Sequence, residues 1–213
     1  MSLLSFRTLS AAWLLSLSAA CSILPKSEPV AIYRLPALAA GQAVAAASTP
    51  AAPASQRSLK IITPYGGRAI DSERILVLPE GNLIQSYQGA RWSDPAPVLL
   101  RNRLLQAFSA DGRIRNLSTD DNNVAADLEL GGDLVAFQTE YRNGAPVVVI
   151  QFNARMVDTA SRRIIAVRSF NVSQPVAGTK VPEVVNAFGA ASGALAAEIL
   201  DWVTGAPGMH AKS

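Results

Sequence analysis

The chain is 213 residues long, with 49% hydrophobic and 16% charged residues and a formal net charge of +3. This length fits one domain of about 100–200 residues with extensions, and so small a charge argues against a nucleic-acid partner. Cys21 is the only cysteine and His210 the only histidine, which excludes an internal disulfide and a zinc or iron–sulfur ligand cluster within this sequence. The composition therefore predicts no metal and no cofactor.

Residues 1–20 have the pattern of a signal peptide. Arg7 precedes an apolar run from Leu9 to Ala20 that consists of Leu, Ala, Ser and Trp. As a helix this run would span about 18 Å, short of the roughly 30 Å hydrocarbon core of a bilayer. It is therefore predicted to be removed rather than to serve as a membrane span.

Ala19 and Ala20 stand directly before Cys21, and this junction resembles the bacterial lipobox, in which the cysteine is diacylated and becomes the mature N-terminus. We expect Cys21 to be lipidated, because several acyl chains on one residue give firm anchoring. Ser18 occupies a position where a lipobox usually has leucine, so an ordinary secretory signal with Cys21 as a bystander stays open as the alternative. Ser22 replaces the aspartate that commonly retains enterobacterial lipoproteins in the inner membrane, which favours the outer membrane.

The segment after the cysteine is predicted to be a tether. Residues 21–29 form a short polar spacer, and Val30 to Pro36 has the composition of a brief strand. Residues 37–56 are an Ala/Pro/Ser-rich stretch without a charged residue, which we expect to be a flexible excursion. Its removal should change stability by less than about 1 kcal/mol on loop-closure grounds.

Three strands and a helix are predicted to open the folded body. The strands are "LKIIT" from Leu59, Arg74–Leu78 and Asn82–Tyr87. The helix is predicted from Asp94 to Phe108, with Ser93 as its N-cap and a glycine beyond its end.

Within this helix, Leu100, Leu104 and Phe108 share one face, whereas Arg101 and Arg103 are expected to point away from it.

The second half of the chain is predicted to be a strand, an antiparallel meander and a long helix. The strand covers Arg113–Leu117. The meander uses Ala126–Glu140, Val147–Val157 and Arg163–Asn171, joined by "YRNG", which carries the Asn-Gly hairpin signal, and by "DTAS". The helix is predicted from Pro182 to Val203.

The predicted fold class is therefore α+β, with one largely antiparallel or mixed sheet and two main helices packed on one face. The domain is placed at 30–204, and residues 205–213 are expected to form a disordered tail.

The stretch "YQGARWSDPAP" contains the first candidate partner-binding residues, Tyr87, Arg91 and Trp92. Such residues dominate interface energetics when they are exposed. The alternative is that Trp92 packs the helix against the sheet while Arg91 pairs with a carboxylate.

Gly189, Gly193 and Ala197 recur at four-residue spacing in the final helix and are the second candidate partner-binding set. They form a strip of small residues along which another backbone could approach closely. The alternative is that the same strip lies flat on the protein's own sheet.

Two further motifs receive structural interpretations. Gly131 and Gly132 lie inside a strand pattern and are expected to mark a β-bulge rather than a phosphate loop. Asp120 and Asp121 could be cation ligands, but their loop lacks the spacing of an EF-hand, so a solvated turn is favoured.

Six segments follow one another along the chain: "IYRLP", "AIDSERILV", "YQGARWSDP", "ADLELGGDLVAF", "NARMVDTASRRIIAVRSF" and "NAFGAASGALAAEILDWV". Together and in this order, they make the sequence resemble the ABC-type transport auxiliary lipoprotein family. The resemblance implies a periplasm-facing, outer-membrane lipoprotein without catalytic residues. It also implies an ABC permease and ATPase and a mammalian-cell-entry (MCE) domain protein as partners, in a system that moves lipid between membranes. A homo-oligomer is a further expectation.

Two other functions stay open. One is a structural lipoprotein of envelope assembly. The other is an envelope hydrolase with a carboxylate pair such as Asp127 and Asp133. On one strand these two residues would lie about 20 Å apart, too far for a glycosidase pair.

Overall fold

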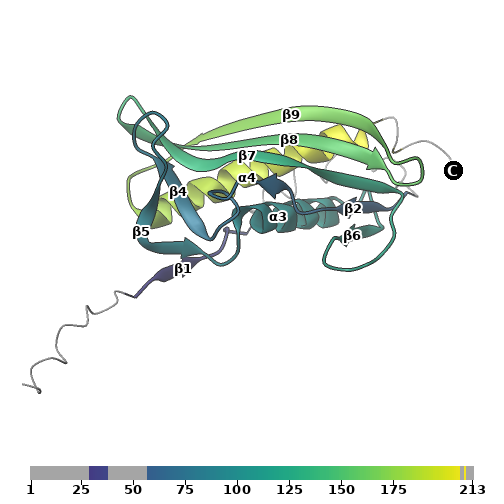
Figure 1. The fold of residues 1–213 in the computed structure, drawn as a ribbon, viewed down its shortest axis with the longest axis horizontal. Coiled ribbons are helices and arrows are strands. Elements are labelled where there is room, and N and C mark those ends of the chain that lie inside the picture. Colours follow the sequence, from purple (N-terminus) through teal and green to yellow (C-terminus); the bar gives the residue numbers. More distant parts are fainter. Residues whose placement is uncertain (1–28, 38–56, 207–208, 210–213) are drawn as a thin grey trace, which may run out of the picture.

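The computed structural model describes residues 29–37, 57–206 and 209. These residues form one nine-stranded sheet and two helices, so the predicted α+β class is confirmed (Figure 1). The predicted signal peptide, Cys21, most of the tether and all but the first residue of the predicted excursion at 37–56 lie outside the described residues.

The strands are β1 (Ala31–Tyr33), β2 (Leu59–Ile61), β3 (Tyr65–Gly66), β4 (Arg74–Leu78), β5 (Gln85–Trp92), β6 (Leu117–Thr119), β7 (Leu128–Arg142), β8 (Ala145–Asp158) and β9 (Arg163–Pro175). The helices are α3 (Ala96–Asp111) and α4 (Val181–Thr204).

Three long strands, β7, β8 and β9, form one side of the sheet, with β9 at its edge. They pair in antiparallel order, as the predicted meander requires. The β7–β8 turn places Asn143 at φ 52° and Gly144 at φ 77°, and two consecutive positive φ values are what a two-residue hairpin turn needs. The Asn-Gly prediction is therefore confirmed.

The other edge of β7 is shared by three short strands, and this makes the sheet mixed. β2, β3 and β4 follow one another along β7, all parallel to it. β6 then pairs with β2, β5 with β4, and β1 with β5. The first part of the chain thus runs beside a strand that is formed about seventy residues later.

Both helices cover the same face of the sheet (Figure 1). The core between the layers contains large side chains from the sheet, such as Phe152 and Phe170, and from the helices, such as Leu104 and Phe188. By length and composition α4 could cross a membrane, but 61% of its most apolar window is buried inside the fold. It is the core helix of this domain.

Helix α3 differs from the prediction at its start and on one face. Pro95, not Ser93, occupies the N-cap position, while Ser93 Oγ donates a hydrogen bond to Asp94 (2.8 Å). The C-terminal prediction is confirmed, since Gly112 ends the helix at φ 75°. Arg101 and Arg103 are both buried, so the expectation that they point away from the core is wrong.

The two buried arginines are held by residues outside the helix and, for Arg103, also by a glutamine of the same helix. Arg101 Nη1 donates to Asp120 (2.9 Å) and Asp121 (2.6 Å). Arg103 donates to the backbone oxygen of Pro36 and to Gln106 Oε1 (3.0 Å).

The prediction of a bulge at Gly131 and Gly132 is also wrong. Both glycines stay in register with β8, and the irregularity in β7 lies between Leu134 and Ala136. Close packing explains the glycines instead. A Cβ on Gly132 would overlap the backbone oxygen of Asn153, and a Cβ on Gly131 would lie 2.5 Å from the tip of Ile62.

The end of the chain differs from the predicted disordered tail at two positions. Ala206 and Met209 are both buried in the core cluster, and each donates its backbone N–H to a residue three positions earlier. The apolar side chains past Thr204 therefore continue the packing of α4.

Candidate functional site

Trp92 lies inside the protein and is not an exposed contact residue. Its side chain is fully buried and meets the ring of Phe188 edge-on, with the centroids 5.2 Å apart. Phe137 contacts it from β7 at 6.1 Å. The packing alternative holds here, since Trp92 joins the sheet to α4.

The neighbours of Trp92 reach the surface to different extents. Tyr87 is half-buried, and burial raises the pKa of its hydroxyl above the usual 10.0. Arg91 is exposed and pairs with Glu73 at 3.1 Å. The predicted patch "YQGARW" is therefore reduced to one ion-paired arginine and part of a tyrosine ring.

The strip of small residues on α4 is divided between interior and surface. Gly189 and Gly193 are buried, whereas Ala197 is exposed. Pro36 fits against Gly189, where a Cβ would lie 2.9 Å from the proline Cγ. Close packing does occur on this strip, but the contacting group is a proline ring of the same chain.

The carboxylates that the sequence offered as cation ligands serve as ion-pair partners. Asp120 and Asp121 both form ion pairs with Arg101. Burial opposes the charged form of Asp120, but hydrogen bonds from the backbone N–H of Thr63 and from the side chain of Arg101 outweigh this effect and lower its pKa. Within the described residues no group of three or more His, Cys, Asp or Glu side chains could hold a metal ion.

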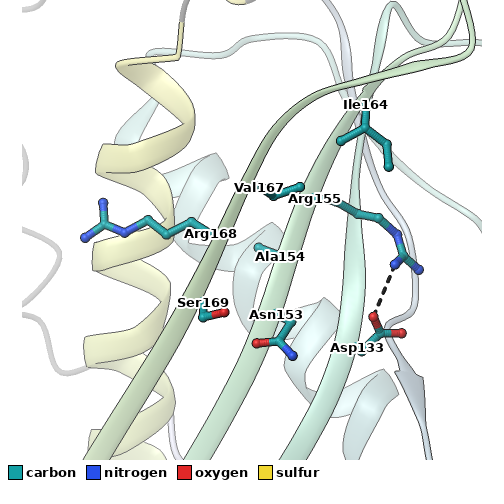
Figure 2. A pocket seen from close by; sticks show the side chains of 8 residues that line it. All are labelled: Asp133, Asn153, Ala154, Arg155, Ile164, Val167, Arg168 and Ser169. Atoms are coloured by element: carbon teal, nitrogen blue, oxygen red, sulfur yellow. Dashed lines mark hydrogen bonds and ion pairs between the residues drawn. The ribbon is translucent and has the colours of Figure 1, made fainter.

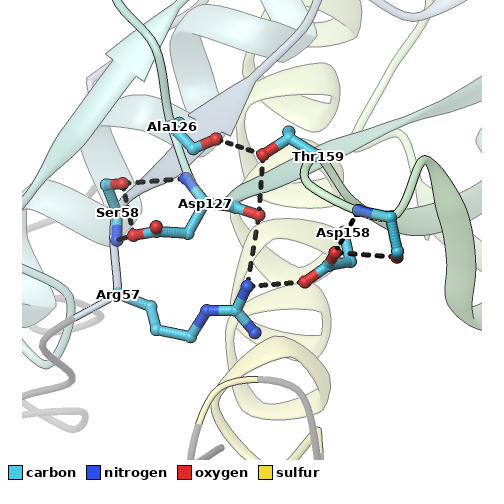
Figure 3. Close-up of polar contacts among 7 residues, drawn as sticks. Arg57, Ser58, Ala126, Asp127, Asp158 and Thr159 are labelled. Atoms are coloured by element: carbon cyan, nitrogen blue, oxygen red, sulfur yellow. Dashed lines mark hydrogen bonds and ion pairs between the residues drawn. The ribbon is translucent and has the colours of Figure 1, made fainter. Parts of the chain in front are cut away.

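The two carboxylates of the hydrolase alternative have separate structural partners. Asp127 accepts from the backbone N–H and the hydroxyl of Ser58, both at 2.7 Å. Beside it, Arg57 donates to Asp158 at 2.7 Å, so this network ties the start of β2 to the end of β8 (Figure 3). Asp133 instead pairs with Arg155 at 3.1 Å. This arrangement provides no acid and base facing one another.

The face of the central sheet opposite the helices is the strongest candidate for an interaction surface. Leu134, Phe152 and Phe170 are aligned across β7, β8 and β9 and are buried on the helix side. Because side chains alternate along a strand, the neighbouring residues Asp133, Asn153 and Ser169 point to the other face.

The alignment of the strands adds one residue of β3 to this polar row and places apolar side chains of β9 beside it. Tyr65 of β3 is aligned with Asp133 and is 71% exposed. Val167 of β9 is aligned with Arg155, and Ile164 with Val157. Val167 is 68% exposed and Ile164 is 59% exposed, which is unusual for β-branched side chains in a regular strand.

A depression of about 330 Å³ lies in this face, between β7, β8 and β9. Figure 2 shows the Arg155–Asp133 ion pair beside this depression, with Ile164 above the pair and Val167 to its left. Its lining also includes Asn153, Ala154, Arg168 and Ser169. We call Tyr65, Asp133, Asn153, Arg155, Ile164 and Val167 the outer sheet face. Exposed apolar groups around a charged pair suit binding of a partner surface.

Sequence reasoning did not find the outer sheet face. The sequence of β9 has apolar residues on both faces of the strand, and their alternation does not indicate which of the two faces is covered by a helix. The contribution of Tyr65 depends on the parallel pairing of β3 with β7, for which the sequence carries no local signal.

Comparison with known proteins gives a family and a fold. The model of the family described as "ABC-type transport auxiliary lipoprotein component" matches residues 33–200. The crystal structure of protein XCC0632 from Xanthomonas campestris, assigned to DUF330, is 28% identical, with a TM-score of 0.73 over 82% of this chain and 94% of that one.

Two further matches agree with this fold or sequence. A solved structure of an uncharacterized protein has a TM-score of 0.63 at 15% identity, over 83% of this chain and 99% of that one. An uncharacterized protein of Bradyrhizobium diazoefficiens is 29% identical over 154 residues, which is 72% of this chain but 41% of the relative. The chain thus spans less than half of that relative's length.

Proposed function

The chain belongs to the family of ABC-type transport auxiliary lipoprotein components, and from this membership we propose that it is a non-enzymatic accessory subunit of an intermembrane transport system in a Gram-negative envelope. The system combines an ABC permease and ATPase with an MCE-domain protein, and its cargo is phospholipid or another hydrophobic compound. In this proposal the subunit is held on the periplasmic side of the outer membrane by acyl chains on Cys21 and docks the MCE conduit there.

Family membership is the observation that carries the proposal. The matched range, residues 33–200, runs from the end of β1 to Leu200 in α4, so it includes the whole sheet and both helices apart from their margins. Asp127 and Asp133, the carboxylates of the hydrolase alternative, are engaged by Ser58 and by Arg155 at separate places, which suits a scaffold better than a hydrolase.

We assign conduit docking to the outer sheet face. Tyrosine and arginine are the side chains that most often dominate binding energy, and this face offers Tyr65 and Arg155 beside exposed aliphatic groups. The candidate partner-binding residues predicted from the sequence offer less exposed surface than the outer sheet face, because Trp92, Gly189 and Gly193 are buried.

Capture of the transporter from membranes tests this docking. The tagged wild-type protein should copurify with an MCE-domain protein and with the permease and ATPase after mild cross-linking. The double variant Ile164→Asp with Val167→Asp should lose at least about tenfold of this capture, as expected when hot-spot contacts are removed. Val124→Asp, at an equally exposed apolar site in a loop, is the matched control. Full capture by the double variant would remove the outer sheet face from the proposal, and capture of outer-membrane assembly proteins instead would favour the structural alternative.

The lipid anchor is tested separately. Cys21→Ser should move the protein from the outer-membrane fraction to the soluble periplasm and abolish labelling with radioactive palmitate. A variant that stays in the membrane fraction with unchanged mobility would contradict acylation. The mass of the purified protein in detergent tests the self-association that we include in the proposal.

A further inference from the structure

Two hairpin turns lie side by side at one end of the sheet. β4 is parallel to β7, and Leu78 is aligned with Glu140, the third-last residue of β7. Residues 79–84, which join β4 to β5, and residues 143–144, which join β7 to β8, therefore project beyond the same end. Figure 1 shows both turns at the left of the molecule, opposite the β8–β9 turn. We call residues 79–84 and 143–144 the hairpin tip.

The hairpin tip presents apolar side chains to solvent. Leu83 and Ile84 are consecutive residues of the β4–β5 turn and are 54% and 53% exposed. Tyr141, at the base of the adjacent turn, is also exposed. Two neighbouring aliphatic residues at the end of a turn contribute nothing to the core, and turns otherwise favour Gly, Asn, Asp and Pro.

The N-terminal end of β1 faces this same end of the sheet. β5 begins at the hairpin tip and runs away from it, and β1 is parallel to β5, with Ala31 aligned with Ala90. The N-terminal end of β1, at Ala31, is therefore directed toward the hairpin tip.

The length of the chain between Cys21 and β1 allows the lipid anchor and the hairpin tip to contact the same bilayer. Nine residue steps separate Cys21 from Val30, and an extended chain of this length reaches about 30 Å. Val30 is level with Gly89, so five residue steps of the irregular strand β5, at most about 17 Å, separate it from Ile84. The β8–β9 turn lies at the far end of a 14-residue strand, about 45 Å from the hairpin tip.

We propose that the hairpin tip is a membrane-contacting surface, in which Leu83 and Ile84 enter the interfacial region of the phospholipid bilayer that holds the lipid anchor. Aliphatic side chains partition into this region, and a lipid anchor brings the tip close to it. The contact orients the sheet end-on to the membrane, so that the outer sheet face stays accessible from the side. This proposal rests on the anchoring of Cys21 in the proposed function.

The solitary cysteine allows a direct test. In the mature lipoprotein the thiol of Cys21 is acylated, so a cysteine introduced elsewhere is the only reactive thiol. Ile84→Cys, Leu83→Cys and, as the control, Ala160→Cys in the exposed β8–β9 turn are labelled with an environment-sensitive fluorophore. The proteins are reconstituted in vesicles of phosphatidylethanolamine and phosphatidylglycerol, with or without lipids that carry a nitroxide quencher.

The expected result is blue-shifted emission, quenched by the nitroxide lipids, from the labels at positions 83 and 84, and water-exposed emission from position 160. Water-exposed emission from all three positions in vesicle-bound protein would overturn the membrane contact and leave the proposed function intact. Shielding of positions 83 and 84 only after the copurifying transport proteins are added would also overturn it, in favour of a protein partner. A Cys21 thiol that reacts with the label in wild-type protein would instead contradict the anchor itself.

Discussion

The ring of Pro36 lies against the backbone of Gly189, so close that a Cβ on the glycine would be 2.9 Å from the proline Cγ. Arg103, from the other helix, donates a hydrogen bond to the backbone oxygen of the same proline. The segment that follows β1 is thus held between α3 and α4. This contact attaches the N-terminal strand, and with it the predicted tether, to the core of the domain.

The Pro36–Gly189 contact predicts that Gly189→Leu is destabilising. A leucine there must displace a rigid ring rather than a flexible side chain, and overpacking of this kind costs about 1–3 kcal/mol. This exceeds the gain of up to about 1 kcal/mol in helix propensity. Urea unfolding followed by circular dichroism measures the change.

Ala197→Leu is the matched control, because it lies two turns later on the same strip and is exposed. It should leave the free energy of unfolding nearly unchanged. Equal stability of the two variants would show that Pro36 does not fill the space beside Gly189.

Trp92→Ala is predicted to be among the most destabilising single substitutions in the domain. The indole is fully buried between Phe137 and Phe188, and removal of a buried aromatic ring typically costs about 3–5 kcal/mol. Trp92→Phe, which keeps an aromatic ring, should lose less than half of this. A loss below about 1 kcal/mol in the alanine variant, measured by urea unfolding, would contradict a core role for Trp92.

The sequence was sufficient for the features that depend on local patterns. Strand Arg74–Leu78 was predicted with its observed bounds, because apolar residues there are flanked by turn residues. The Asn143-Gly144 turn was predictable for a similar reason, since few other dipeptides accept two positive φ values. The long final helix followed from its apolar stripe.

Features that depend on distant partners could not be predicted in this way. Arg101 seemed to be a surface residue of its helix, and only the folded chain brings Asp120 and Asp121 to its guanidinium. The outer sheet face combines residues of four strands, β3, β7, β8 and β9, and its composition depends on their register. The burial of Gly189 depends on Pro36, which is about 150 residues away in the sequence.

The Arg57–Asp158 pair predicts a stability contribution that disappears in acid. Hydrogen bonds from Arg57 and Ser161 lower the pKa of Asp158 from 3.8 to about 2. Because the folded protein holds this carboxylate in its charged form, the contribution is complete above the unfolded pKa near 4 and is lost as the pH falls toward 2. The difference in melting temperature between wild type and Asp158→Asn should therefore be largest above pH 4, decrease between pH 4 and pH 2, and vanish only below pH 2.

Asp71→Asn, at an exposed carboxylate away from this network, controls for the general effect of removing a negative charge. A difference between wild type and Asp158→Asn that persists unchanged at pH 2 would show that the network does not depend on the charge of Asp158.

Gly131 and Gly132 provide a last prediction, because two adjacent glycines meet obstacles of different kinds. Gly132 has φ 151°, and a Cβ there would overlap the backbone oxygen of Asn153 in the paired strand. Gly132→Ala must therefore either distort the β7–β8 ladder or separate the strands, at a cost of about 3 kcal/mol. A Cβ on Gly131 meets Cδ1 and Cγ1 of Ile62, both at 2.5 Å, and this side chain can change its rotamer. Gly131→Ala should thus cost less than about 1 kcal/mol. Equal losses in the two variants, measured by urea unfolding, would mean that the β7–β8 ladder yields at Gly132 and that close backbone approach is not the reason for the glycine.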